Sequence, residues 1–140
     1  MTRLRWWFRI VGAFYLLLAL MNLYVMFFTD GQAVLAGSPF PVNALTVRVA
    51  TDYWSSSAFG LLGAGLFLLW AARAPERYVT VARYAAWLEL TMWGAYDVFA
   101  LARGYDPASY GAFGVIHLII IVTGFWFARP ADGARPAAAV

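Results

Sequence analysis

Four long apolar segments, separated by polar stretches, dominate the pattern of this sequence; they extend over residues 6–28, 53–72, 78–102 and 108–128. Because an α-helix rises about 1.5 Å per residue, each segment is long enough to cross a hydrocarbon core of about 30 Å. None of the segments alternates apolar and polar residues as the strands of a membrane barrel do. The pattern therefore predicts an all-α membrane protein, an up-down bundle of four transmembrane helices in a single domain over residues 1–128.

Turn-forming residues mark the breaks between these segments. The longest break, residues 29–52, contains several glycines and prolines and is the predicted outer loop. Its last part, from Asn43, can also form interfacial helix, because Arg48 and Asp52 are four residues apart. The tail, residues 129–140, is rich in proline, alanine and glycine and is predicted to be disordered in the cytoplasm.

Arginine placement predicts the orientation of the bundle. All ten basic residues are arginines, and in the up-down order eight fall on one side of the membrane. These eight are Arg3, Arg5, Arg9, Arg73, Arg77, Arg83, Arg129 and Arg135, against Arg48 and Arg103 on the other side. Because loops rich in basic residues stay in the cytoplasm, both termini are expected there, in a bacterial inner membrane. The arginines flank apolar runs rather than form a phosphate-binding face, so nucleic acid is not an expected partner.

The first apolar segment also has some marks of a secretory signal. Arg3 and Arg5 precede it, and the small-residue site 34–36 follows it. However, the apolar region of a signal peptide has only about 7–15 residues, and this run is longer. The segment is therefore interpreted as an uncleaved anchor.

Composition excludes several kinds of chemistry. The chain of 140 residues is 64% apolar, above the roughly 45–50% of soluble domains, and has no cysteine. Disulfides, thiolate metal sites, iron–sulfur clusters and thiol nucleophiles are thereby excluded. Its only histidine, His117, rules out a bis-histidine haem. A metal site of His117 with Glu89 and Asp97 would require their helices to adjoin, which no spacing demands, so neither a metal nor a cofactor is expected.

Polar side chains inside the predicted membrane spans are the candidate functional residues. Glu89 and Asp97 lie on one stripe of the third helix with Trp93 between them, and a charged acid at a helix centre costs roughly 2.5–3.5 kcal/mol if it faces lipid. That stripe is therefore expected to face inward. His117 lies near the middle of the fourth helix, at the depth of Glu89, so these two are possible partners. With Asn22 and Asp97 nearer the outer side, they suggest a polar track from the outer surface to a Glu89/His117 pair.

Three interpretations of these groups remain open. They can simply hydrogen-bond across helices, which is worth only about 0.6 kcal/mol on average in membranes. They can bind or transport a small molecule, or perform acid–base chemistry as an intramembrane isomerase does, since burial shifts the ionisation of such groups. Separately, Ser56, Gly60 and Ala64 recur at four-residue intervals and favour close helix packing, either with the first helix, which is preferred, or with a second protomer.

The opening segment, residues 4–15 (LRWWFRIVGAFY), together with Asn22, resembles the BphX-like family of small four-helix bacterial membrane proteins. The resemblance lies mainly in the first helix, while the other three agree in number and length. It implies no assigned reaction, only occurrence beside pathways for aromatic or hydrophobic compounds, and it transfers no functional residue. DoxX-like and emopamil-binding-type bundles are similar only at the level of the fold.

The sequence thus predicts a protein that handles a small hydrophobic molecule in an outward-facing pocket formed by Glu89, Asp97, His117, Asn22 and Trp93. The expected partners are the lipid bilayer and that ligand, together with a second copy of the chain or another membrane protein. The competing interpretation is a structural or accessory subunit of a membrane complex, in which the polar residues only pack helices.

Overall fold

The computed structural model describes residues 2–129, which form helices joined by short turns, with no strand in this range. Both the final part of the predicted tail and its expected disorder lie outside the described residues. The helices are α1 (Thr2–Phe28), a 3-10 turn (Gln32–Leu35), α2 (Ala44–Ala71), α3 (Val79–Leu88), a π-helical segment η2 (Glu89–Gly94), α4 (Ala95–Ala102) and α5 (Pro107–Phe127).

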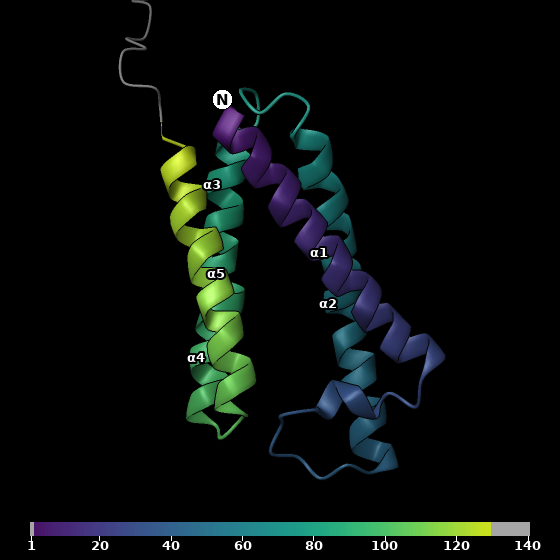
Figure 1. The fold of residues 1–140 in the computed structure, drawn as a ribbon. Coiled ribbons are helices and arrows are strands. Elements are labelled where there is room, and N and C mark those ends of the chain that lie inside the picture. The colour runs from purple at the N-terminus through teal and green to yellow at the C-terminus, as the bar shows by residue number, and fades with distance from the viewer. Residues whose placement is uncertain (1, 130–140) are drawn as a thin grey trace, which may run out of the picture.

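The helices form two arms that meet at one end and diverge at the other (Figure 1). One arm is α1 packed along α2, and the second is the stack of α3, η2 and α4 packed along α5. The start of α1, the turn between α2 and α3 and the end of α5 lie together at what we call the narrow end. The loop after α1 and the turn between α4 and α5 lie at the wide end.

Two glycines allow the close packing of α1 on α2. A Cβ atom on Gly12 would lie 3.0 Å from the carbonyl oxygen of Gly65, and a Cβ on Gly65 would lie 2.9 Å from that of Gly12. The small-residue contact of the second helix is thus made with the first helix of the same chain, as preferred from the sequence. It is not made where the repeat suggested, because Ser56 and Gly60 are exposed and a Cβ on Gly60 would meet nothing within 4 Å.

At the narrow end the two arms are bonded together. The indole Nε1 of Trp7 on α1 donates to the hydroxyl of Thr123 on α5 at 3.1 Å. Within the second arm, the guanidinium of Arg83 donates to the carbonyl oxygen of Ala128 from Nε at 3.0 Å and from Nη2 at 2.8 Å. A Cβ on Gly124 would lie 2.9 Å from the Trp7 ring, so α1 approaches α5 closely here.

At the wide end a loop bridges the gap between the arms. The backbone N–H of Asp106, at the start of α5, donates to the carbonyl oxygen of Gly37 at 2.8 Å. Gly37 has a φ of +74°, a left-handed conformation that glycine adopts without steric cost. The Asp106 side chain also caps α5, accepting from the backbone N–H of Ser109 at 2.8 Å and from its hydroxyl at 2.6 Å. These hydrogen bonds lower the pKa of the Asp106 carboxyl from its ordinary value.

The second helix begins at Ala44, well before the apolar core predicted at residue 53. The cause is a capping box: the side-chain oxygen of Asn43 accepts from the backbone N–H groups of Leu45 and Thr46, and the Thr46 hydroxyl accepts from the N–H of Asn43. The predicted outer loop of residues 29–52 is therefore shorter, and its last part, from Ala44, is helical.

Large apolar side chains cover the outside of both arms, among them Ile10, Phe59 and Val98, each more than half exposed. Three helices, α1, α2 and α5, are long and apolar enough to span a membrane. The segment predicted as the remaining crossing, residues 78–102, is not one regular α-helix, because η2 interrupts it between α3 and α4. Among the described residues the structure therefore has three uninterrupted candidate spans rather than four.

Candidate functional site

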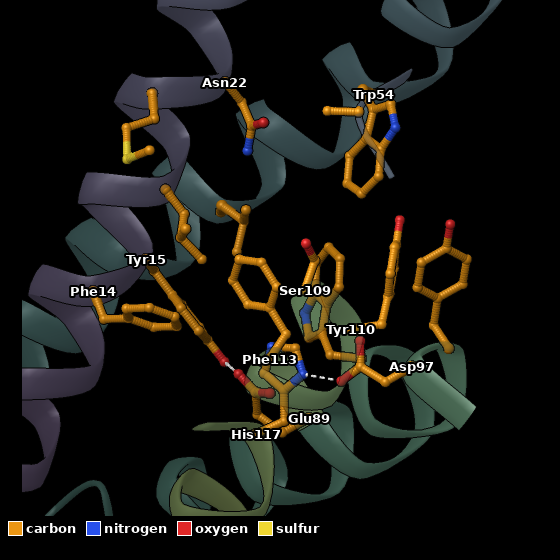
Figure 2. A pocket seen from close by; sticks show the side chains of 16 residues that line it. Phe14, Tyr15, Asn22, Trp54, Glu89, Asp97, Ser109, Tyr110, Phe113 and His117 are labelled. Atoms are coloured by element: carbon orange, nitrogen blue, oxygen red, sulfur yellow. Dashed lines mark hydrogen bonds and ion pairs between the residues drawn. The ribbon is translucent and has the colours of Figure 1, made fainter. Parts of the chain in front are cut away.

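A cavity of about 330 Å³ lies between the two arms, and aromatic side chains form much of its lining (Figure 2). It reaches from the wide end, where Ala36 and Ser109 line it, to Glu89 and His117 in the middle of the second arm. Its volume is at the lower end of the range of small-molecule pockets. The residues that line it are Phe14, Tyr15, Leu18, Met21, Asn22, Ala36, Trp54, Leu61, Glu89, Trp93, Tyr96, Asp97, Ser109, Tyr110, Phe113 and His117.

Glu89 connects the two arms at the deep end of the cavity. It is fully buried in η2, and its Oε1 accepts a hydrogen bond from the hydroxyl of Tyr15 on α1. The other carboxyl oxygen, Oε2, is also buried and has no hydrogen-bond partner among the described residues. Leaving a buried polar atom unsatisfied costs roughly 1–3 kcal/mol, and more if the group is charged, so Oε2 favours a hydrogen-bond donor.

Asp97 and His117 form a pair between α4 and α5. Nδ1 of His117 lies 2.6 Å from Oδ2 of Asp97, and both side chains are buried. Two further rings lie near the imidazole, with centroids 6.2 Å away for Trp93 and 6.1 Å for Phe113. A carboxylate at Nδ1 fixes the orientation of the ring and leaves Nε2 as the nitrogen available for other contacts.

The π-helical segment explains how Glu89, Trp93 and Asp97 reach the same cavity. Eight residues of a regular α-helix overrun two full turns by about 80°, which would rotate Asp97 away from Glu89. A π-helix bonds each residue to the fifth along and has a wider turn, so η2 takes up part of that rotation. Such segments are often found at functional sites.

All five residues selected from the sequence line this one cavity: Glu89, Trp93, Asp97, His117 and Asn22. The suggested direct pairing of Glu89 with His117 is wrong, because His117 bonds to Asp97 and Glu89 bonds to Tyr15. The physical reason is rotation about the helix axes: the α4 carboxylate faces α5, whereas the η2 carboxyl faces α1 across the cavity (Figure 2). Asn22 lies nearer the wide end, half-buried on α1.

Comparison with known proteins gives a family. The model of the BphX-like family matches residues 1–133, nearly the whole chain. This chain belongs to the BphX-like family. The match extends the resemblance of the first helix to all the described helices, and it assigns no activity to the chain. No curated protein and no solved structure matches.

Sequence reasoning missed several residues of this BphX-like cavity. Tyr15 is the most important, because it supplies the hydroxyl that Glu89 accepts. It continues the buried face of Leu4, Phe8 and Val11 at helical spacing, and a tyrosine hydroxyl on such a face usually needs a partner. That signal was available in the sequence. The contributions of Trp54, Tyr110 and Phe113 gave no comparable signal, since aromatic residues also face lipid.

The ionisable side chains that the structure describes are not grouped as a metal site. Among residues 2–129, no three histidine, aspartate or glutamate side chains come together in a group suited to a metal ion. His117 and Asp97 contact each other, but Glu89 is engaged by Tyr15. The three-ligand site considered from the sequence would need all three on one ion.

Proposed function

We propose that this chain is a four-crossing protein of the bacterial inner membrane that binds a small hydrophobic molecule in the cavity between its arms. The observation that carries this proposal is the lining of the cavity. Aromatic rings surround it, and three buried ionisable side chains, Glu89, Asp97 and His117, meet it at its deep end. A mostly apolar pocket with a few convergent polar groups is the usual form of a small-molecule site.

Three features support membrane insertion with four crossings. Large exposed apolar side chains on both arms suit a lipid environment. Residues 79–102 rise about 36 Å when stacked as one helix, so α3, η2 and α4 together are long enough to be the remaining crossing. A π-helical turn keeps backbone groups bonded within the segment, as the bilayer interior requires.

The arginines support an orientation with both termini in the cytoplasm. Arg73 and Arg77 lie in the turn between α2 and α3, at the same narrow end as the first residues of α1. By the positive-inside tendency this end faces the cytoplasm. The wide end, and with it the mouth of the cavity, then faces outward.

One observation favours acid–base chemistry as a second candidate. The bond between Asp97 and Nδ1 of His117 is the arrangement that orients a histidine for proton transfer, with Nε2 as the working nitrogen. A turnover function would require a substrate atom within hydrogen-bond reach of that nitrogen. Conversion of a bound molecule during incubation would distinguish an enzyme from a binding protein.

Native mass spectrometry of the gently extracted protein tests the proposed binding function. Leu18→Trp would fill the cavity from α1, whereas Leu17→Trp, its neighbour, replaces a residue that is 56% exposed on the outer face. We expect a small molecule to accompany the wild type and Leu17→Trp but to be lost from Leu18→Trp. Equal retention of the small molecule by all three proteins would show that it does not bind in the cavity. A co-purifying protein with no small molecule would favour the accessory-subunit function.

A further inference from the structure

The cavity is lined by more acidic than basic side chains. Two carboxyl groups, Glu89 and Asp97, line it, but only one basic side chain does, that of His117. No arginine is among the lining residues that the structure describes. Asp97 is matched by His117 at 2.6 Å, so even with a protonated imidazole that pair is neutral and Glu89 has no counter-charge.

The lack of a positive partner concerns one atom of Glu89 in particular. Its Oε1 is satisfied by Tyr15, while the fully buried Oε2 has no partner within the described chain. An ionised carboxylate in such a place is strongly disfavoured unless a positive charge or a strong donor approaches it. An N–H of a cationic amine supplies both at once, in a charge-assisted hydrogen bond.

The walls around this acid suit the remainder of such a ligand. Tyr15 lies beside the acid, and Trp93 lines the same cavity from the segment that carries Glu89. Trp54 and Tyr110 line the part of the cavity nearer the wide end. The negative face of an aromatic ring attracts a cation by about 0.5–2 kcal/mol, and more than one ring can act on the same charge. The same rings accept the apolar body of a ligand by stacking.

From these observations the geometry points to a hydrophobic organic cation as the ligand of the cavity: a ring-bearing molecule whose basic amine donates to Glu89 Oε2 while its apolar part lies among the aromatic side chains. This inference rests on the proposed binding function and adds the charge class of the ligand. It assigns Glu89 the role of counter-ion, and it leaves Asp97 paired with His117 in the wall of the site.

A matched pair of probes tests the charge class. 4-Phenylpiperidine is a cation at neutral pH, and phenylcyclohexane has nearly the same shape without the amine. Binding of each to the purified protein in detergent is measured by native mass spectrometry, with the micelle-bound fraction of each probe determined in protein-free detergent. We expect the amine to bind at least tenfold more tightly than the hydrocarbon.

Variants at Glu89 assign that preference to one residue. Glu89→Gln keeps the size of the side chain and removes its charge, and we expect it to weaken amine binding at least tenfold while leaving hydrocarbon binding unchanged. Glu76→Gln is the control, because Glu76 is exposed in the turn between α2 and α3. If Glu89→Gln does not fold, two results still decide whether the cavity takes a cation. They are the preference of the wild type for the amine over the hydrocarbon and the loss of amine binding in the cavity-filling Leu18→Trp variant.

The outcomes separate this inference from the proposed function. Equal binding of both probes, displaced by Leu18→Trp but not by Leu17→Trp, would overturn the cation and retain the pocket. Amine binding that is equally strong in Glu89→Gln would overturn the assignment of the counter-ion. If neither probe binds the wild type and no small molecule accompanies the extracted protein, both the inference and the proposed function are wrong.

Discussion

Glu89 is held in the protein interior by one hydroxyl group. Tyr15 donates to its Oε1, and no other hydrogen bond to either carboxyl oxygen exists among the described residues. Because Tyr15 and Glu89 come from different arms, this contact also connects α1 with η2 across the cavity. Glu89, one of the candidate residues from the sequence, is thus also a polar link between the arms.

Removing that hydroxyl should be costly. Tyr15→Phe keeps the ring and leaves both oxygens of a buried carboxyl unpartnered, so we expect the free energy of unfolding to fall by about 1–3 kcal/mol. Unfolding in mixed detergent micelles with increasing dodecyl sulfate measures this change. Tyr24→Phe on the same helix is the control, because Tyr24 is 61% exposed. Equal stability of the two variants would contradict the Tyr15–Glu89 bond.

The sequence predicts which residues face inward but not how they pair. Charge in lipid is costly, so Glu89, Asp97 and His117 could be assigned to the interior from residue type alone. Their partners depend on helix rotations of a few tens of degrees, which decide whether a side chain faces α1 or α5. The wider turn of η2 changes those rotations, and no periodicity in the sequence indicates such a turn.

At the scale of elements, the contact between α1 and α2 depends on the absence of two side chains. The Cβ positions of Gly12 and Gly65 lie within 3.0 Å of the opposing backbone oxygens, so neither helix can accept a methyl group without moving. Gly63, two residues earlier, has nothing within 4 Å of its Cβ position. Substitutions at Gly65 and Gly63 can therefore distinguish the effect of helix packing from the effect of helix propensity.

Gly65→Ala should destabilise the protein while Gly63→Ala should not. Overpacking a close contact costs typically about 1–3 kcal/mol. In the open position, alanine in place of glycine favours a helix by up to about 1 kcal/mol. We expect opposite shifts of the thermal unfolding midpoint of the purified variants in the same detergent. A fall of similar size at both positions would show that the glycines serve backbone flexibility and not the helix contact.

Helix positions were largely predictable, and helix boundaries were less so. Apolar runs located all four segments, because burial and lipid both require such runs. The start of α2 was placed late because Arg48 and Asp52 weaken the apolar pattern there, although Asn43 and Thr46 form the capping box that starts the helix. The division at η2 was missed, since Glu89–Gly94 contains no proline and only one glycine, at its end.

At the scale of the whole molecule, the two arms diverge toward the wide end, and the size of their buried residues differs along their length. At the narrow end the small residues Ala82, Ala86, Gly124 and Ala128 are buried within the second arm, and the ring of Trp7 from α1 packs against Gly124. Toward the wide end large aromatic residues from both arms line the cavity that lies between them. The sizes of these residues can be read from the sequence. The cavity can be predicted only when both arms are placed together, because it lies between them.

The orientation of the whole molecule is open to a direct test, because the chain has no cysteine. Glu76→Cys places a thiol in the exposed turn between α2 and α3 at the narrow end, and Gln32→Cys places one in the exposed 3-10 turn at the wide end. With the positive-inside arrangement, an impermeant maleimide added to intact spheroplasts should label position 32 and should reach position 76 only after permeabilisation. The reverse pattern would invert the protein and make the cavity open to the cytoplasm. Labelling of both positions from outside would mean that α2 does not cross the membrane, and it would overturn the four-crossing arrangement itself.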